Sequence, residues 1–124
     1  MIFGIGTDIV ETDRIRKAIE NYGKRFLDRL YTADEQLYCD SFNDTKWVHY
    51  AARFAAKESF SKAIGTGLTR EFKFSEISIL NEESGKPYVV LSGGLLDKYG
   101  KYKTHISLSH TDSNSIAYII MEEI

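Results

Sequence analysis

Two acidic side chains are the first residues in the sequence that could support catalysis. Asp8 follows Gly4 and Gly6 on one face of a predicted strand, and Glu58 precedes Lys62 by one turn of a predicted helix. Isolated carboxylates suit Mg²⁺, which binds one or two of them and completes its shell with waters and substrate phosphates. A nearby lysine can stabilise charge on the leaving group during phosphoryl transfer. The residue types therefore indicate metal-assisted phosphoryl chemistry.

Each of these features also has a purely structural interpretation. Gly4 and Gly6 could equally allow close packing by a helix. Glu58 and Lys62 stand in the favourable order for a simple i,i+4 ion pair. Spacing along the chain does not bring Asp8 beside Glu58, so the metal site is a hypothesis at this point.

A second polar surface is predicted near the end of the chain. In the predicted strand 104–110, His105, Ser107 and Ser109 alternate with apolar residues, so they share one face. That face is either solvated or part of a site. His110 ends the strand, where a lone histidine is more often structural than functional.

Several well-known catalytic motifs are absent from the sequence. It contains no P-loop, no G-x-S-x-G elbow, no H-E-x-x-H and no C-x-x-C. The single cysteine, Cys39, has no activating base evident in the sequence, so nucleophilic cysteine catalysis is unsupported. A lone thiol is typical of a protein in a reducing cytosol.

Charge is segregated along the chain, although the net charge is only −2. Segment 32–45 has four acidic residues and no basic one, whereas segment 12–31 is rich in basic residues. The basic residues of the latter are Arg14, Arg16, Lys17, Lys24, Arg25 and Arg29. The near-balanced total argues against general nucleic-acid binding. The local basic surface indicates a specific acidic partner, or simply a solvated helix face.

The composition predicts a single compact domain. The chain has 124 residues, of which 43% are hydrophobic and 27% charged, enough to bury roughly two thirds of its unfolded surface. No stretch approaches the roughly 20 apolar residues of a membrane span. The start of the chain has no basic region and reaches Asp8 too early for a signal peptide. We therefore expect a cytoplasmic protein.

The predicted elements give an α+β fold, with antiparallel strands packed against a long central helix. Gly23 should break the first helical region, and Thr32 with Glu35 forms a capping box. The predicted strands are 2–10, 74–81, 87–91, 104–110 and 115–121, and the predicted helices are 13–22, 24–30, 32–42, 46–64 and a short one ending near residue 99.

Four ordered segments of this sequence resemble the motifs of the 4′-phosphopantetheinyl transferases, and of their short bacterial branch in particular. The segments are GIGTDIVE at 4–11, RFAAKESFSKA at 53–63 with GTG at 65–67, SGKP at 84–87, and ISLSHT at 106–111. Any one of them is a weak signal. Their order, together with the chain length, makes the set specific.

The resemblance implies an enzyme that moves 4′-phosphopantetheine from coenzyme A to a serine of apo acyl carrier protein in fatty acid biosynthesis. Adenosine 3′,5′-bisphosphate would be released. Asp8 and Glu58 would then bind Mg²⁺ together with the pyrophosphate of coenzyme A. Lys62 would contact the pyrophosphate and stabilise the leaving group. Glu58, directly or through a metal-bound water, would help to remove the serine proton.

The resemblance also implies where the nucleotide binds. The turn formed by Ser84, Gly85, Lys86 and Pro87 would lie against the adenosine. Arg53 and His105 are candidates for the 3′-phosphate, which favours a fork of donors. His110 and Thr111 would line the same site.

The basic segment would receive the carrier protein, which is acidic in this family. Arg14 is the strongest candidate contact, followed by Lys17, Lys24 and Arg25. Longer members carry a D-x-E pair, but here Val10 occupies the second position. Because this chain resembles half of those proteins, the resemblance implies a homotrimer with active sites at the subunit interfaces.

Two rival functions are consistent with the same residues. One is another Mg²⁺-dependent enzyme that acts on a nucleotide or pyrophosphate compound. The other is a coenzyme A-binding module without catalytic activity, for which replacement of Glu58 would leave binding intact.

Overall fold

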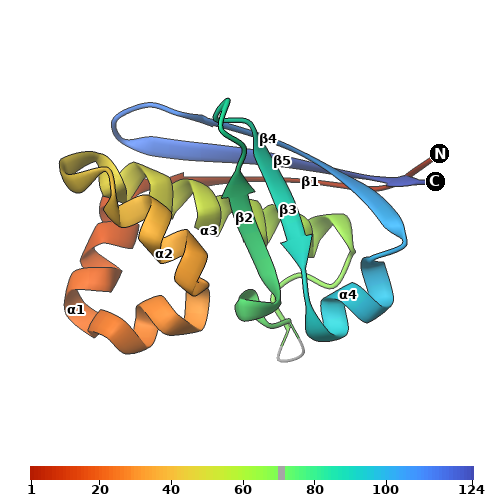
Figure 1. Cartoon of the computed structure of the whole chain (residues 1–124), viewed down its shortest axis with the longest axis horizontal. Coiled ribbons are helices and arrows are strands. Elements are labelled where there is room, and N and C mark those ends of the chain that lie inside the picture. Colours follow the sequence, from red (N-terminus) through yellow and green to blue (C-terminus); the bar gives the residue numbers. More distant parts are fainter. Residues whose placement is uncertain (70–71) are drawn as a thin grey trace.

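The computed structural model describes residues 1–69 and 72–124 of the chain. Its elements follow one another from the red N-terminal end to the blue C-terminal end of Figure 1. They are β1 (Ile2–Glu11), α1 (Thr12–Leu30), α2 (Ala33–Asp40), α3 (Lys46–Ala63), β2 (Ile77–Asn81), β3 (Pro87–Leu91), α4 (Gly93–Tyr99), β4 (Tyr102–His110) and β5 (Asn114–Glu123). Short 3₁₀ turns occupy Asn43–Thr45 and Phe74–Glu76. Within the described residues, no helix is both long and apolar enough to span a membrane.

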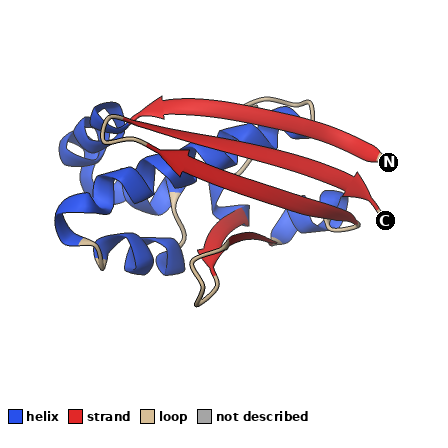
Figure 2. Ribbon diagram, turned by 90° about the horizontal axis from the view of Figure 1, so that it is seen from above, coloured by secondary structure: helices blue, strands red, loops and turns tan. Residues whose placement is uncertain are grey.

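The strands form two antiparallel sheets. The larger has the order β1-β5-β4, and the smaller pairs β2 with β3. The long strands of the larger sheet lie across one side of the helical layer (Figure 2), where α3 packs against β1 and β5. Helices α1 and α2 gather at the end of the molecule away from both termini (Figure 1). The predicted α+β class with a long central helix is confirmed.

Local sequence signals account for the first helices. α1 contains Gly23 at φ 66°, where the helix is kinked as predicted. The capping box of α2 is also present: Glu35 donates its backbone N–H to Thr32 Oγ1 at 3.3 Å, and Thr32 donates its own to Glu35 Oε1 at 2.9 Å. The predicted strand 74–81 begins later, at Ile77, because Phe74–Glu76 forms a 3₁₀ turn. Phe74 instead stacks on Phe54 of α3.

The glycines of β1 allow α3 to pack directly against the strand. A Cβ on Gly4 would lie 1.9 Å from the Ala63 carbonyl oxygen, and one on Gly6 would lie 1.9 Å from the Ser59 carbonyl oxygen. The helix backbone therefore fills the space beside Gly4 and Gly6. This confirms the interpretation that the two glycines allow close packing by a helix. Asp8 comes next on the same face of β1, so this contact brings it against α3.

A buried ion pair connects four elements of the core. The fully buried Lys57 Nζ donates to Glu35 Oε1 at 2.6 Å, to the Leu30 carbonyl at 2.7 Å and to the Phe74 carbonyl at 3.1 Å. Glu35 Oε2 accepts the Ile79 N–H at 2.9 Å. The pair thus joins the end of α1, the start of α2, the middle of α3 and β2. Burial lowers the pKa of Lys57, and the Glu35 carboxylate opposes that shift.

Candidate active site

Asp8 and Lys62 meet across the contact between β1 and α3. Lys62 Nζ donates to the Thr7 carbonyl at 2.9 Å and to Asp8 Oδ1 at 3.2 Å. The ion pair recorded for Lys62 is therefore with Asp8, on another element, rather than with Glu58 one turn away. The simple helix pair was the wrong interpretation, because the glycines let β1 approach the Lys62 side of α3.

Glu58, one turn before Lys62 on α3, is near enough to Asp8 for the two carboxyl groups to influence each other. Burial, followed by the adjacent carboxyl group of Asp8 and its negative charge, raises the pKa of Glu58 to about 7. The positive charges of Lys62 and Arg14 act in the opposite direction. Two carboxylates this close share a proton or a cation, since like charges in one site disfavour full ionisation.

The second oxygen of Asp8 has no hydrogen-bond partner. Oδ2 is buried and unpaired among the described residues, which is costly unless a ligand completes its shell. With Glu58 alongside, this oxygen presents a hard, anionic donor set suited to Mg²⁺. No cluster of three or more metal-binding side chains occurs within residues 1–69 and 72–124. The arrangement therefore fits an ion that takes its remaining ligands from water and substrate.

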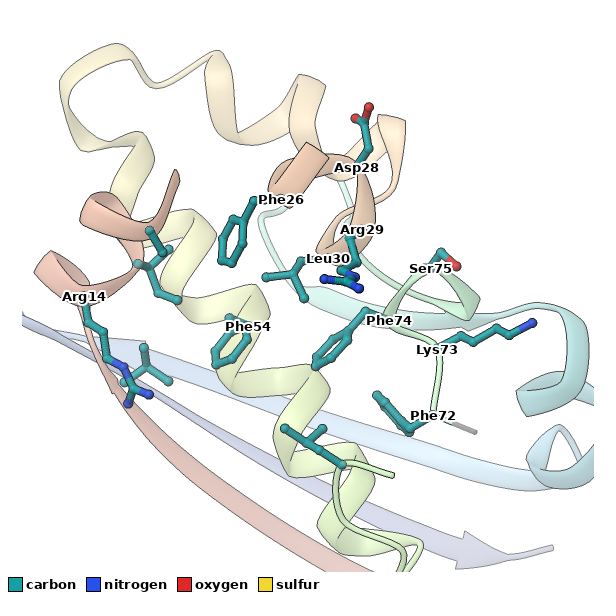
Figure 3. A pocket seen from close by; sticks show the side chains of 14 residues that line it. Arg14, Phe26, Asp28, Arg29, Leu30, Phe54, Phe72, Lys73, Phe74 and Ser75 are labelled. Carbon is teal, nitrogen blue, oxygen red and sulfur yellow. The ribbon is translucent and has the colours of Figure 1, made fainter. Parts of the chain in front are cut away.

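Arg14 lies close to this pair and at the edge of an apolar cavity. Its charge lowers the pKa of Glu58, and its side chain lines a cavity of about 690 Å³ between α1, α3 and the 3₁₀ turn of Phe74–Glu76. Figure 3 shows Phe26, Phe54 and Phe74 around this cavity, with Arg14 at its side. Arg14 thus connects the basic helix with the carboxylates.

The other basic residues of α1 point into solvent or pair locally. Lys17 lies 4.0 Å from Asp13, and Lys24 lies 3.2 Å from Asp28. Arg25 is exposed. Arg29, which was not selected from the sequence, also lines the cavity (Figure 3). The only signal for Arg29 was its place in the basic segment.

Arg53 lies on another side of α3. It precedes Glu58 by five positions, which turns its side chain by about 140° around the helix. It is only 1% exposed, its Nη2 donates to Asn81 Oδ1, and its guanidinium carbon lies 4.4 Å from the centre of the Tyr38 ring. The donor fork expected to face a phosphate is instead engaged inside the protein.

The expected nucleotide-binding turn lies on the Arg53 side of the molecule. Ser84, Gly85 and Lys86 are exposed and Pro87 is half-buried. Asn81 Nδ2 donates to the Gly85 carbonyl at 2.9 Å, which ties the turn to the partner of Arg53. The turn is thus separated from Asp8 and Glu58 by the width of α3.

His105, His110 and Thr111 also lie away from the two carboxylates. His105 pairs with Glu122 at 3.0 Å and is on the sheet face opposite to Asp8, because its register partner is Ile120 whereas that of Asp8 is the buried Ala117. His110 lies 6.3 Å from His49, measured between ring centres. Thr111 Oγ1 accepts the Asn114 N–H at 3.1 Å within the β4–β5 turn. One chain therefore brings Asp8, Glu58 and Lys62 together, but leaves the turn, His105 and His110 apart from them, with the two histidines on opposite faces of the sheet.

The outer face of the larger sheet is more apolar than its β4 residues suggested. Ile5, Ile9 and Tyr118 are 62%, 65% and 48% exposed. The register aligns these residues with the polar strip of β4, since Tyr118 pairs with Ser107. Exposed apolar faces of this kind are typical of interaction surfaces.

Comparison with known proteins identifies the family. The model of the 4′-phosphopantetheinyl transferase superfamily matches residues 4–119. The chain is 50% identical to the holo-[acyl-carrier-protein] synthase of Clostridium novyi, over 98% of this chain and 88% of that protein. It is 48% identical to the holo-[acyl-carrier-protein] synthase of Ruminiclostridium cellulolyticum, over 94% of this chain and 90% of that protein.

A solved structure agrees with these relatives. The holo-(acyl-carrier-protein) synthase of Bacillus anthracis in complex with CoA (3′,5′-ADP) matches with a TM-score of 0.85 and 34% identity, over 100% of this chain and 99% of that one. The motifs that resembled this family lie within the matched residues. The chain therefore belongs to the 4′-phosphopantetheinyl transferase superfamily.

Proposed function

We propose that this protein is a cytoplasmic holo-[acyl-carrier-protein] synthase that transfers 4′-phosphopantetheine from coenzyme A to a serine of apo acyl carrier protein, for fatty acid biosynthesis. The observation that carries the proposal is the meeting of Asp8, Glu58 and Lys62 between β1 and α3, in a chain that matches relatives of that name over almost its whole length. Coenzyme A is the donor, consistent with the ligand of the Bacillus anthracis structure.

Asp8 and Glu58 would hold Mg²⁺. The buried, unpaired Oδ2 of Asp8 supports this assignment, as does the raised pKa of Glu58. When bound, the ion supplies Lewis-acid polarisation of the phosphoryl oxygens and offsets charge on the pyrophosphate. Val10 contributes no third carboxylate, so the remaining ligands would have to come from water and substrate oxygens.

The chain's own residues provide positioning and charge. The serine oxygen forms a bond to the phosphorus that carries the pantetheine arm, and the bond from this phosphorus to the bridging pyrophosphate oxygen breaks. Lys62, whose ammonium group is half-exposed beside Asp8, stabilises the negative charge on the released adenosine 3′,5′-bisphosphate. Glu58, directly or through a metal-bound water, would help to remove the serine proton.

The direct test combines the protein with coenzyme A, Mg²⁺ and an apo acyl carrier protein, followed by mass spectrometry of the carrier. We expect a mass increase of one phosphopantetheine group, lost with Asp8→Ala, Glu58→Ala or EDTA. A folded protein that binds coenzyme A but leaves a competent carrier unmodified would favour the non-catalytic binding module instead. Survival of activity in Asp8→Ala would overturn the metal assignment.

The separation of the Ser84–Pro87 turn from Asp8 favours a homotrimer with active sites shared between copies. Asp8 and the Ser84–Pro87 turn lie on different sides of α3, and the apolar outer sheet face around Ile9 and Tyr118 is exposed in a single chain. Burial of that face by neighbouring copies would remove its apolar surface from water. The residues expected to bind the nucleotide, which are Lys86, His105, His110 and Thr111, would then belong to one copy. Asp8 and Glu58, which would hold Mg²⁺, would belong to its neighbour.

Subunit mixing tests the shared site. Asp8→Ala and His105→Ala proteins should each be weakly active. An equimolar mixture reassembled as trimers should regain about a quarter of wild-type activity. At about one interface in four, an intact Asp8 from one copy meets an intact His105 from its neighbour. Ile9→Glu should give a monomer by analytical ultracentrifugation. No gain on mixing, with trimers present, would refute the shared site.

The carrier would dock on α1, with Arg14 as the main contact and Lys17, Lys24 and Arg25 in support. Arg14→Glu should raise the KM for the carrier and weaken the dependence of that KM on salt, because an attractive charge is lost, while the affinity for coenzyme A stays nearly unchanged. Lys98→Glu on α4 is a control with the same change of charge. Equal effects of the two variants would remove the assignment of the carrier to α1.

A further inference from the structure

Asn81 connects α3 to the tip of the β2–β3 turn. Its Oδ1 accepts a hydrogen bond from Nη2 of the buried Arg53, and its Nδ2 donates to the Gly85 carbonyl at 2.9 Å. Both polar ends of the amide are therefore used, one toward the helix and the other toward the turn. Asn81 belongs to none of the motifs in the sequence that resemble the family.

The turn has few other anchors. Glu82 donates its N–H to the Lys86 carbonyl at 2.9 Å, and Gly85 donates its N–H to the Glu82 carbonyl at 2.8 Å. Gly85 has φ 92°, a conformation that glycine adopts without the penalty of a side chain. These bonds close the turn at the end of the β2–β3 ladder, whose last register pair is Asn81 and Pro87, and the bond from the Asn81 side chain adds a link from the Gly85 carbonyl to Arg53 of α3.

Burial of the Arg53 guanidinium costs more free energy than an ordinary structural hydrogen bond would justify. Its guanidinium is buried, and its Nε has no hydrogen-bond partner among the described residues. Its recorded partners are the neutral Asn81 and the Tyr38 ring. A buried cation with neutral partners costs free energy. Asn81 connects this cation to the turn that carries Lys86, so a bound anion near the turn would be favoured by positive charge from both residues.

We infer that Asn81 is a positioning residue for the nucleotide. Its two hydrogen bonds fix the Gly85 carbonyl relative to the buried Arg53. The Ser84–Pro87 turn is thereby held in the conformation that binds the adenosine bisphosphate end of coenzyme A. Arg53 thus acts on the nucleotide through Asn81 and through its charge, rather than by direct contact with the 3′-phosphate. The inference rests on the proposed function, because it takes the turn as the nucleotide site.

Asn81→Ala is the primary test. In the free protein, hydrogen exchange at the Gly85 and Glu82 amides should accelerate about tenfold, since their turn loses its tether. The Kd for adenosine 3′,5′-bisphosphate and the KM for coenzyme A should rise about tenfold, which corresponds to about 1.4 kcal/mol. The kcat at saturating coenzyme A and the KM for the carrier should stay within about twofold.

Two further variants separate positioning from a general loss of stability. Gln36→Ala removes an amide that also makes two hydrogen bonds, to Asp28 and to the Tyr31 carbonyl, far from the turn. It should lower Tm comparably while nucleotide affinity is kept. Asn81→Asp keeps an acceptor for Arg53 but has no N–H for Gly85, so Tm should hold while the turn amides still exchange faster.

Three results would overturn the inference. Unchanged exchange at Gly85 and Glu82 in Asn81→Ala would show that the amide does not order the turn. Faster exchange with unchanged nucleotide affinity would show that order in the turn is irrelevant to binding. If the wild-type protein itself binds no adenosine 3′,5′-bisphosphate, the proposed nucleotide site fails and the role of Asn81 fails with it. The first two results leave the proposed function standing.

Discussion

Gly6→Ala tests whether the contact between β1 and α3 sets the geometry of the active site. The added Cβ would lie 1.9 Å from the Ser59 carbonyl oxygen, 2.8 Å from its carbonyl carbon and 3.0 Å from the Ala63 nitrogen. All three are backbone atoms of α3, so no side chain can move aside to make room. The strand and the helix must therefore separate by roughly 1.5 Å before ordinary contact distances are restored.

The separation should reduce activity more than stability. Over-packing of a core typically costs about 1–3 kcal/mol, out of about 5–15 kcal/mol for a domain, so a large fraction of the protein stays folded. Asp8 lies two residues further along β1, and its contact with Lys62 spans the same gap at 3.2 Å. A misplacement of about 1 Å at reacting groups can cost about 100-fold in rate.

The assay compares kcat/KM for carrier modification with Tm. For Gly6→Ala we expect a loss of about 100-fold in kcat/KM with a cooperative thermal transition retained. Gly94→Ala in α4 is the matched control, because its added Cβ would lie 3.5 Å from Glu76 Oε1, an ordinary contact distance. That control should keep wild-type activity. A folded Gly6→Ala protein with wild-type kcat/KM would refute the argument that this contact positions Asp8.

Glu35→Gln should lower the free energy of unfolding by about 3–5 kcal/mol, because the buried Lys57 ammonium loses its counter-charge. Urea unfolding at one fixed subunit concentration measures the loss, and an equal loss for the exposed neighbour Asp34→Asn would contradict the prediction. Thr32→Ala should cost about 1 kcal/mol through loss of the α2 cap, and the same measurement on Thr45→Ala, whose side chain makes no cap bond, should show less. Burial raises the pKa of the Cys39 thiol to about 12, so at about pH 8 iodoacetamide should modify it only after unfolding. Rapid modification of the native protein would show that Cys39 is accessible.

The elements themselves were predictable because short-range interactions determine them. The alternation in β1, the glycine at position 23 and the capping box of Thr32 and Glu35 each act within a few residues, and the structure confirms all three. The start of β2 was wrong because aromatic packing of Phe74 on Phe54, which are far apart in the sequence, competes with the strand pattern.

The site was predicted by motif, whereas its geometry was not. Helical spacing allowed an ion pair between Lys62 and Glu58, but the structure pairs Lys62 with Asp8, since only the packing of β1 on α3 brings residues 54 positions apart together. Burial likewise depends on every element that surrounds a side chain. Arg53 was expected to face a phosphate, yet α2 and β2 enclose it.

The sequence by itself determined the class of fold, the family and the residue types available for chemistry, because these follow from local patterns and ordered motifs. Only the tertiary structure decided which of those residues meet. Asp8, Glu58 and Lys62 converge because two glycines let strand and helix backbones touch. The Ser84–Pro87 turn stays apart from them because the α3 helix stands between, and a side chain cannot reach through a packed helix.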